Sequence, residues 1–172
     1  MKILNWMRCL PIVASLFCLS SCGYHLDGVK AVPLEHMDTF SVRMFENNSL
    51  EVQAGVLVTN AITDMVQRDG TYKLASSGDC DFRIEGKISN ISFQSLQVKS
   101  SNTYISTELD LVLTVHYRIV ETKTNETLMS RTLTKRASFY NEETNTQMAR
   151  DNAISYAARK LAEDIALSIS TQ

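Results

Sequence analysis

Cysteine is scarce in this chain, and neither sign of charge is in large excess. The 4 cysteines among 172 residues are too few, and too unevenly placed, for a disulfide scaffold or a zinc site. A net charge of −2 argues against a protein whose main task is to coat nucleic acid. With 44% hydrophobic residues the chain is too apolar for a disordered tail, and its length fits one globular domain.

The sequence also lacks the residue spacings that carry catalysis or metal binding. Its histidines, His25, His36 and His116, lie far apart, and no His-x-x-x-His or Cys-x-x-Cys pair occurs. Neither a Gly-x-Ser-x-Gly motif nor a phosphate-cradling glycine-rich loop is present. His116 is expected on the outer face of a strand, where a surface role is the usual one. We therefore expect no catalytic residue, no metal, no cofactor and no enzymatic activity.

Residues 1–21 have the organisation of a secretory signal. Lys2 and Arg8 supply positive charge, and the apolar stretch Leu10–Leu19 follows. This stretch is too short to cross a bilayer, which requires about 20 residues. A buried N-terminal helix is the alternative reading, but Pro11 would interrupt it.

The signal ends in Leu19-Ser20-Ser21-Cys22, which resembles the lipobox of bacterial lipoproteins. The resemblance implies that Cys22 becomes the first residue of the mature protein and is acylated on its sulfur and its new amine. Gly23 follows, where an aspartate would favour retention in the inner membrane, so the resemblance implies the outer membrane. Three acyl chains would anchor the protein firmly, whereas a single chain anchors only marginally.

Removal of the signal leaves a more acidic protein with one thiol. Without Lys2 and Arg8 the 17 basic residues become 15 against 19 acidic ones, so the net charge changes from −2 to −4. Cys80 is then the one unmodified cysteine. It is either a small buried residue or, in an oxidising compartment, the site of an intermolecular disulfide.

Residues 22–38 show no persistent period and are expected to tether Cys22 to a single domain over residues 39–172. Alternation across Thr39–Phe45 predicts the first strand. Apolar residues at spacings of three and four then predict a helix over residues 49–68, with a capping box at its start and Gly70 at its end. The capping box would pair Asn48 with Glu51, and the buried face would consist of Leu50, Ala54, Leu57, Ala61 and Met65.

Three further strands and a second helix are predicted. Residues 82–93 alternate with a phase slip near Ser89-Asn90, which indicates a β-bulge. Residues 109–119 alternate without error, and a turn at Lys123–Glu126 predicts a hairpin with residues 129–140. Thr144 and Gln147 would cap the final helix, whose apolar face is rich in alanine.

The predicted element order is β-α-β-β-β-α, so the fold class is α+β. Two helices cannot cover both faces of a four-stranded sheet well. We therefore expect a two-layer sandwich in which a four-stranded, mostly antiparallel (mixed) sheet carries both helices on one face. The first two strands, joined by a helix, would run parallel, and the other face would be open and polar.

Three segments resemble the lipopolysaccharide-assembly lipoprotein family, LptE. Cys22-Gly23-Tyr24-His25-Leu26 is similar to the family's opening Cys-Gly-aromatic-x-Leu. The first strand runs into Phe45-Glu46-Asn47-Asn48-Ser49 and a helix, as it does in the family. Cys80-Asp81-Phe82-Arg83-Ile84-Glu85-Gly86 is similar to the family's Ala-Asp-x-x-Leu-x-Gly. The element order agrees over nearly all of the mature chain.

This resemblance implies an outer-membrane lipoprotein that plugs a large β-barrel lipopolysaccharide-assembly protein and helps it to assemble. It also implies that the protein assists delivery of lipopolysaccharide to the outer leaflet. The expected partners are the barrel, lipopolysaccharide and the membrane through the lipid anchor, without nucleic acid. The domain would lie on the periplasmic side or within the barrel lumen. The alternative is an outer-membrane regulator of a cell-wall synthase, which would be expected to have a longer linker after Cys22.

Four basic residues are candidates for binding the anionic ligand, because clustered arginine and lysine bind phosphate well. They are Arg118, Arg131, Lys135 and Arg136. Arg131 and Lys135 share the parity of the apolar residues of their strand, so we expect them near a strand edge or end. The alternative is an ordinary solvated strand.

Overall fold

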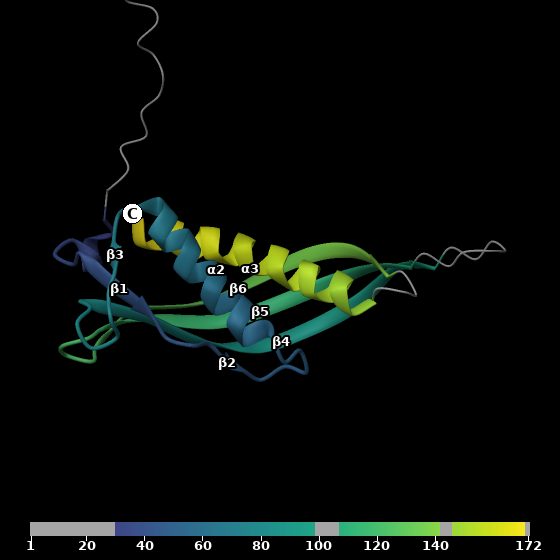
Figure 1. The fold of residues 1–172 in the computed structure, drawn as a ribbon, viewed down its shortest axis with the longest axis horizontal. Coiled ribbons are helices and arrows are strands. Elements are labelled where there is room, and N and C mark those ends of the chain that lie inside the picture. Colours follow the sequence, from purple (N-terminus) through teal and green to yellow (C-terminus); the bar gives the residue numbers. More distant parts are fainter. Residues whose placement is uncertain (1–29, 99–106, 142–145, 171–172) are drawn as a thin grey trace, which may run out of the picture.

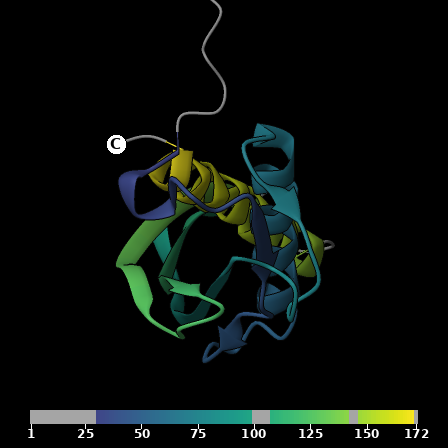
Figure 2. The ribbon, with the colours of Figure 1, turned by 90° about the vertical axis from the view of Figure 1, so that its left-hand side faces the viewer.

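The computed structural model describes residues 30–98, 107–141 and 146–170. They form a two-layer α+β sandwich in which two helices lie side by side on one face of a curved sheet (Figures 1 and 2). The predicted fold class and the placement of both helices are therefore confirmed. Among these residues, no helix combines the length and the apolar character needed to cross a bilayer.

The sheet has six strands, where four were predicted. Four strands correspond to the predicted ones: β1 (Thr39–Val42), β4 (Phe82–Val98), β5 (Thr107–Glu121) and β6 (Thr127–Asn141). The additional strands, β2 (Glu46–Asn47) and β3 (Lys73–Leu74), are too short to show alternation. The strand order is β3-β1-β4-β5-β6, with β2 paired to β4.

The sheet is mixed in the way that the sequence predicts. β1 runs parallel to β4, with Phe40 opposite Phe82, as expected for strands joined through a helix. β4, β5 and β6 form an antiparallel meander. The predicted bulge is present between Ile88 and Asn90, where the register of β4 shifts against β5. Asn125 makes the turn between β5 and β6 with a φ of 61°, a conformation that asparagine tolerates.

The first strand is shorter than predicted. It ends at Val42, and the Met44 side chain is 57% exposed, whereas Phe45 is 2% exposed. The chain therefore turns after Val42 and directs Phe45 under α2 (Ala54–Asp69). The Phe45 N–H donates a hydrogen bond to the Thr59 hydroxyl of α2 at 3.0 Å, which fixes this turn.

The start of α2 also differs from the prediction. Leu50 is 98% exposed and precedes the helix, so it is not part of the buried face. The predicted Asn48–Glu51 capping box is absent, and no side chain caps the helix. The Asn47 side chain instead organises the preceding turn, accepting the Ser49 N–H and donating to the Glu51 carbonyl. The predicted end is confirmed, since Gly70 adopts the left-handed conformation with a φ of 78°.

The second helix, α3 (Thr146–Ser170), packs its alanine-rich face against β5, β6 and α2. The predicted face is buried: Ile154, Ala157, Ala158, Leu161, Ile165 and Ile169. Its small residues allow the two helices to lie close together. Thr144, the predicted cap, lies outside the described residues.

The core lies between the helices and the inner face of the meander. Alternate residues of β5 from position 111 to position 119 contribute to it: Leu111, Leu113, Val115, Tyr117 and Ile119. This confirms the inside and outside faces that alternation predicts for β5.

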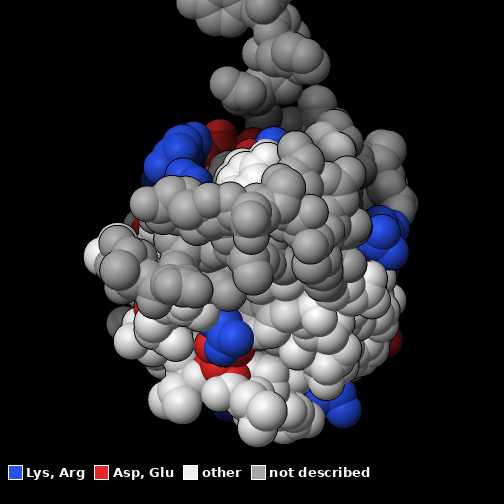
Figure 3. All heavy atoms as spheres, turned by 90° about the vertical axis from the view of Figure 1, so that its right-hand side faces the viewer, with Lys and Arg blue, Asp and Glu red and all other residues white. Residues whose placement is uncertain are grey.

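The end of the molecule on the right of Figure 1 shows scattered charged side chains among uncharged ones (Figure 3).

The chain enters the domain beside the end of α3. A short 3-10 helix, η2 (Val32–Leu34), follows Ala31, whose N–H donates to the carbonyl of Ile169 at 3.0 Å. The Tyr72 hydroxyl donates to the same carbonyl at 2.9 Å. Ala31 and Leu34 are buried, so the last part of the expected tether packs against the domain.

Candidate functional site

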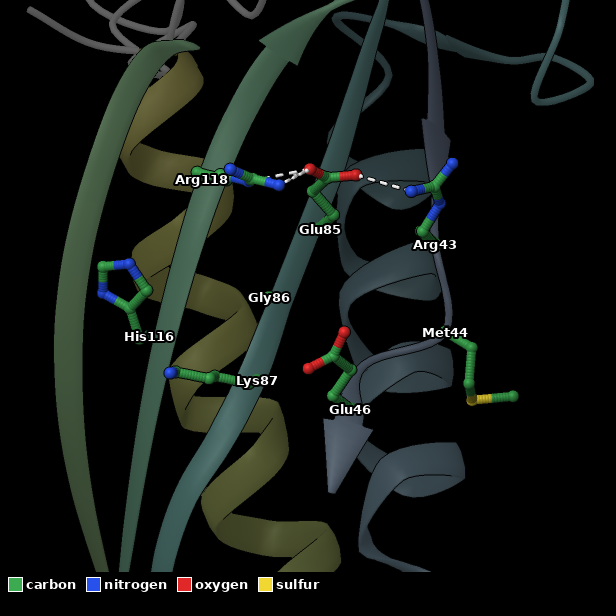
Figure 4. Close-up of a pocket in the computed structure, with 8 residues that line it drawn as sticks. All are labelled: Arg43, Met44, Glu46, Glu85, Gly86, Lys87, His116 and Arg118. Carbon is green, nitrogen blue, oxygen red and sulfur yellow. Dashed lines mark hydrogen bonds and ion pairs between the residues drawn. The ribbon is translucent and has the colours of Figure 1, made fainter. Parts of the chain in front are cut away.

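The face of the sheet away from the helices carries a pocket of about 310 Å³ (Figure 4). The pocket lies where the segment after β1 approaches β4 and β5. Charged side chains dominate its lining, with Arg43 and Glu46 on one side and Lys87 and Arg118 on the other.

Glu85 of β4 is the centre of this pocket. It is 5% exposed, although it points away from the helices. Its Oε1 accepts a hydrogen bond from Arg118 Nε at 2.7 Å, and its Oε2 lies 3.1 Å from Arg83 Nε and 3.2 Å from Arg43 Nη1. One carboxylate therefore joins three guanidinium groups from the β1 end, β4 and β5. Figure 4 shows two of them, Arg43 and Arg118, on either side of Glu85.

The arginines keep Glu85 ionised. Burial alone would raise the pKa of Glu85, but the hydrogen bond from Arg83 and the charge of Arg118 together outweigh burial, so the pKa is lowered. The Arg43 and Arg118 side chains remain 62% and 55% exposed. Because one carboxylate cannot satisfy three guanidinium groups, part of each exposed group is available to a second anion.

Lys87 and His116 extend the polar surface along the same strands. They stand opposite each other in the β4–β5 pairing. His116 Nδ1 lies 3.1 Å from the Thr132 hydroxyl of β6. The predicted outer-face position of His116 is thus confirmed, and its ring is held by a neighbouring hydroxyl.

Gly86 allows the strands to approach each other below the pocket. A Cβ at this position would lie 2.4 Å from the carbonyl oxygen of His116 and 2.7 Å from Cε1 of Phe45. Any side chain at Gly86 would therefore force β4 away from β5 or displace Phe45. A close backbone approach of this kind is a common reason for a glycine inside a strand.

The pocket is suited to holding an anionic group. Guanidinium groups bind phosphate and carboxylate through paired, charge-assisted hydrogen bonds, and Lys87 adds a further cation. Within the described residues, no group of three or more histidine, cysteine, aspartate or glutamate side chains could hold a metal ion.

The structure does not bring the four predicted ligand-binding residues together. Arg118 lines the pocket. Arg136 is on the same face of the sheet but stands opposite Val112, roughly 20 Å along β5 from Arg118. Arg131 and Lys135 have the parity of the helix-facing residues, and Lys135 Nζ forms an ion pair with Asp164 of α3 at 2.6 Å. The position of these two on the outermost strand agrees with the expected strand edge.

Sequence reasoning missed the other charged residues of the pocket, which are Arg43, Glu46, Glu85 and Lys87. A signal existed, because residues 83, 85 and 87 are all charged and alternate with apolar or small residues. That alternation places them on the outer face of a strand. Their grouping around Arg118 depends on the β4–β5 register, which the sequence pattern does not provide.

Cys80 lies outside this pocket and is buried. Its side chain is enclosed near the start of β4, where Sγ lies 3.1 Å from the Ser41 hydroxyl and 3.3 Å from the Thr122 hydroxyl. This environment favours the small buried residue over the intermolecular disulfide, because a partner thiol cannot reach the sulfur.

Comparison with known families gives one match that spans most of the domain. The model of the family described as LptE, lipopolysaccharide-assembly, matches residues 37–169. This range extends from just before β1 to the last turn of α3. A comparison with curated protein sequences finds no match.

Several solved structures are similar to this chain at low sequence identity. A lipoprotein from Caulobacter crescentus has a TM-score of 0.54 at 11% identity, covering 76% of this chain and 87% of that one. A hypothetical protein from Chlamydia trachomatis has a TM-score of 0.53 at 6% identity, covering 77% and 95%. The rare lipoprotein B of Shewanella oneidensis has a TM-score of 0.49 at 9% identity, covering 76% and 92%. The first two show a shared fold.

Proposed function

We propose, because this chain belongs to the LptE family of lipopolysaccharide-assembly proteins, that it is an outer-membrane lipoprotein of the lipopolysaccharide translocon. In this role it plugs and helps to assemble a large β-barrel and assists delivery of lipopolysaccharide to the outer leaflet. The observation that carries the proposal is the family match over residues 37–169, which includes both helices and all six strands.

Membrane attachment in this proposal depends on Cys22. Residues 1–21 are cleaved as a signal peptide, and Cys22 is acylated as the lipobox resemblance implies. Residues 22–29 then connect the lipid to Ala31, where the chain packs against the domain. At roughly 3.5 Å per residue, so short a connection holds the domain close to the membrane surface.

The plug role is supported by the open face of the sheet. Hydroxyl side chains of β5 and β6 pair across this face, among them Thr114 with Thr134 at 3.2 Å. Ser138 donates to Asp110 on the same face. Such a surface can exchange hydrogen bonds with the polar inner wall of a barrel, while the core beneath remains intact.

Contact with lipopolysaccharide is proposed at the charged pocket. The phosphate groups of lipopolysaccharide would meet Arg43, Lys87 and Arg118. These three positive charges outnumber the two negative charges of the acidic residues beside them. Arg131, Lys135 and Arg136 remain predicted contacts at the edge of the sheet. The overall acidity of the chain makes such local cationic groups necessary for an anionic ligand.

The first test is a pull-down of the Cys22-lipidated protein from detergent-extracted membranes, analysed by mass spectrometry. We expect stoichiometric recovery of one large β-barrel protein. The Cys22→Ser protein is the control, since it keeps the domain and loses the anchor. Recovery of a cell-wall synthase without a barrel would instead support the regulator function.

Direct ligand binding needs a separate measurement. We expect the Arg43→Ala/Arg118→Ala protein to bind purified lipopolysaccharide at least tenfold more weakly than the unchanged protein. Arg68→Ala is a matched control, because Arg68 is an exposed arginine at the end of α2, away from the pocket. Equal weakening by both changes would show that net charge, not the pocket, determines binding.

A further inference from the structure

β6 is an exposed edge of the sheet. Within the described residues its 15-residue backbone pairs with β5 alone. No other described backbone group bonds to it. An edge strand presents unpaired N–H and C=O groups, and these can pair with a further strand.

A groove runs between the end of this edge and the first half of α3. Its volume is about 480 Å³, larger than the charged pocket. The β6 side is formed by residues 137–140, and alanines of α3, Ala149 and Ala153, leave the space open. Tyr140 and Tyr156 stand at the groove, 61% and 47% exposed. These exposed aromatic side chains are typical of a surface that binds protein.

An ion pair joins β6 to α3 beyond the residues that line the groove. Lys135 of β6 and Asp164 of α3 are 2.6 Å apart and bridge the strand to the helix. The part of the edge that borders the groove is residues 137–140, roughly 13 Å of strand. This length suits an extended segment of four or five residues.

The charge of β6 indicates what kind of segment would fit. The strand contains Arg131, Lys135 and Arg136 and no aspartate or glutamate. Lys135 is paired with Asp164, so Arg136, next to the groove residues 137–140, is the cation of the strand that would meet a ligand there. Two copies of the chain pairing edge to edge would place these cations together, so self-association is disfavoured. An acidic segment would instead be attracted. Arg159, which also lines the groove, adds a cation from α3.

We propose that this groove binds an extended acidic segment of a partner protein, which adds to β6 as a further strand. Side chains alternate along such a strand. Aliphatic side chains on one face enter the groove beside Ala137 and Phe139, and acidic side chains on the other face approach Arg136. Main-chain hydrogen bonds supply affinity and the groove supplies selectivity, as in other cases of strand addition. The site shares no lining residue with the charged pocket, and Arg136 beside it is also one of the predicted lipopolysaccharide contacts.

The probe for this site is a fluorescein-labelled peptide of seven alternating valine and aspartate residues. We expect saturable binding to the folded chain by fluorescence anisotropy, with protection of β6 amides in hydrogen exchange. A second peptide, N-methylated on alternate backbone nitrogens, should bind at least tenfold more weakly, because it cannot pair with the edge.

Two substitutions fill the groove without touching the core. Ala149→Trp and Asn152→Trp should each weaken peptide binding at least tenfold, since both positions line the groove and neither is buried. Lys160→Trp is the matched control, an exposed α3 position outside the groove that should leave binding unchanged. Circular dichroism of each variant checks that the fold is retained.

Three results would overturn the proposal. The first is no saturable binding of the valine–aspartate peptide at roughly millimolar concentration. The second is equal binding of the N-methylated peptide, which would exclude strand pairing. The third is a concentration-dependent dimer, seen by sedimentation and lost in Ala149→Trp, which would make a second copy the occupant.

Discussion

Gly86→Ala should destabilise the domain strongly, because the added methyl group would clash with neighbouring atoms. The added Cβ would meet the His116 carbonyl oxygen at 2.4 Å, Phe45 Cε1 at 2.7 Å and Tyr117 Cα at 2.9 Å. Two of these atoms belong to the backbone of β5. That backbone is fixed by ladders to both β4 and β6, so it cannot retreat without breaking hydrogen bonds.

The expected magnitude follows from the kind of atoms involved. An extra methyl group in a well-packed interior costs about 1–3 kcal/mol when flexible side chains can adjust. Here the backbone contacts leave little room for adjustment, so we expect a loss of about 3 kcal/mol in the free energy of unfolding. At roughly 2–4 °C per kcal/mol for a domain of this size, the thermal midpoint should fall by about 6–12 °C.

Urea unfolding followed by circular dichroism measures this change, and Gly78→Ala is the matched control. Gly78 lies in an exposed turn, and a Cβ there meets no atom within 4 Å. Alanine at such a position leaves stability unchanged or raises it by about 0.4–1 kcal/mol, because it restricts the unfolded chain. If the two variants differed by less than about 1 kcal/mol, the proposed close packing of β4 on β5 would be wrong.

Three further predictions concern the core and two titrating groups. Leu113→Asp places an unpaired charge at a fully buried site of β5 and should abolish folding, so an unchanged thermal midpoint would contradict the assigned faces. The pKa of Asp81 is lowered by hydrogen bonds from the Asp38 N–H and from Thr39, so its contribution is present above about pH 4 and is lost as the pH falls further. Asp81→Asn should therefore make the free energy of unfolding depend less on pH in acid solution. An unchanged dependence on pH would count against this contribution of Asp81. Burial and the charge of Asp69 raise the pKa of Tyr72 to about 12, so its contribution is present below pH 10 and is lost as the pH rises towards 12. Tyr72→Phe should reduce this alkaline loss in pH-dependent unfolding, and an identical alkaline limb would refute it.

The long meander was predictable because one side of each strand is buried. A period of two across residues 109–119 leaves a single choice of faces, and the structure adopts it. The bulge near Asn90 was equally visible, since an inserted residue must reverse the parity of everything after it.

The start of α2 was not predictable from spacing alone. Leu50 satisfies the helical period, yet the turn before the helix is held by the Asn47 side chain, which leaves Leu50 in solvent. The bonds that decide this boundary are local and polar, and the apolar pattern does not report them.

The charged pocket was only partly predictable. Arg118 stood out as a cation on the outer face of a clear strand. Its partner Glu85 lies 33 positions earlier in the sequence, and their contact depends on the β4–β5 register. Arg43 joins them because β1 ends early, which is a consequence of the turn that buries Phe45.

The hydrogen bond between Ala31 and Ile169 has a consequence for the connectivity of the chain. Since the two described ends already touch, a short linker could join them and new ends could be opened elsewhere. The exposed turn at residues 76–79, between β3 and β4, is a suitable opening. Such a circular permutant would begin with the β4–β5–β6 meander, whose contacts are local in sequence, and would receive β1 and α2 last. The order in which the polypeptide is synthesised could thus be changed while every strand pairing described above is kept.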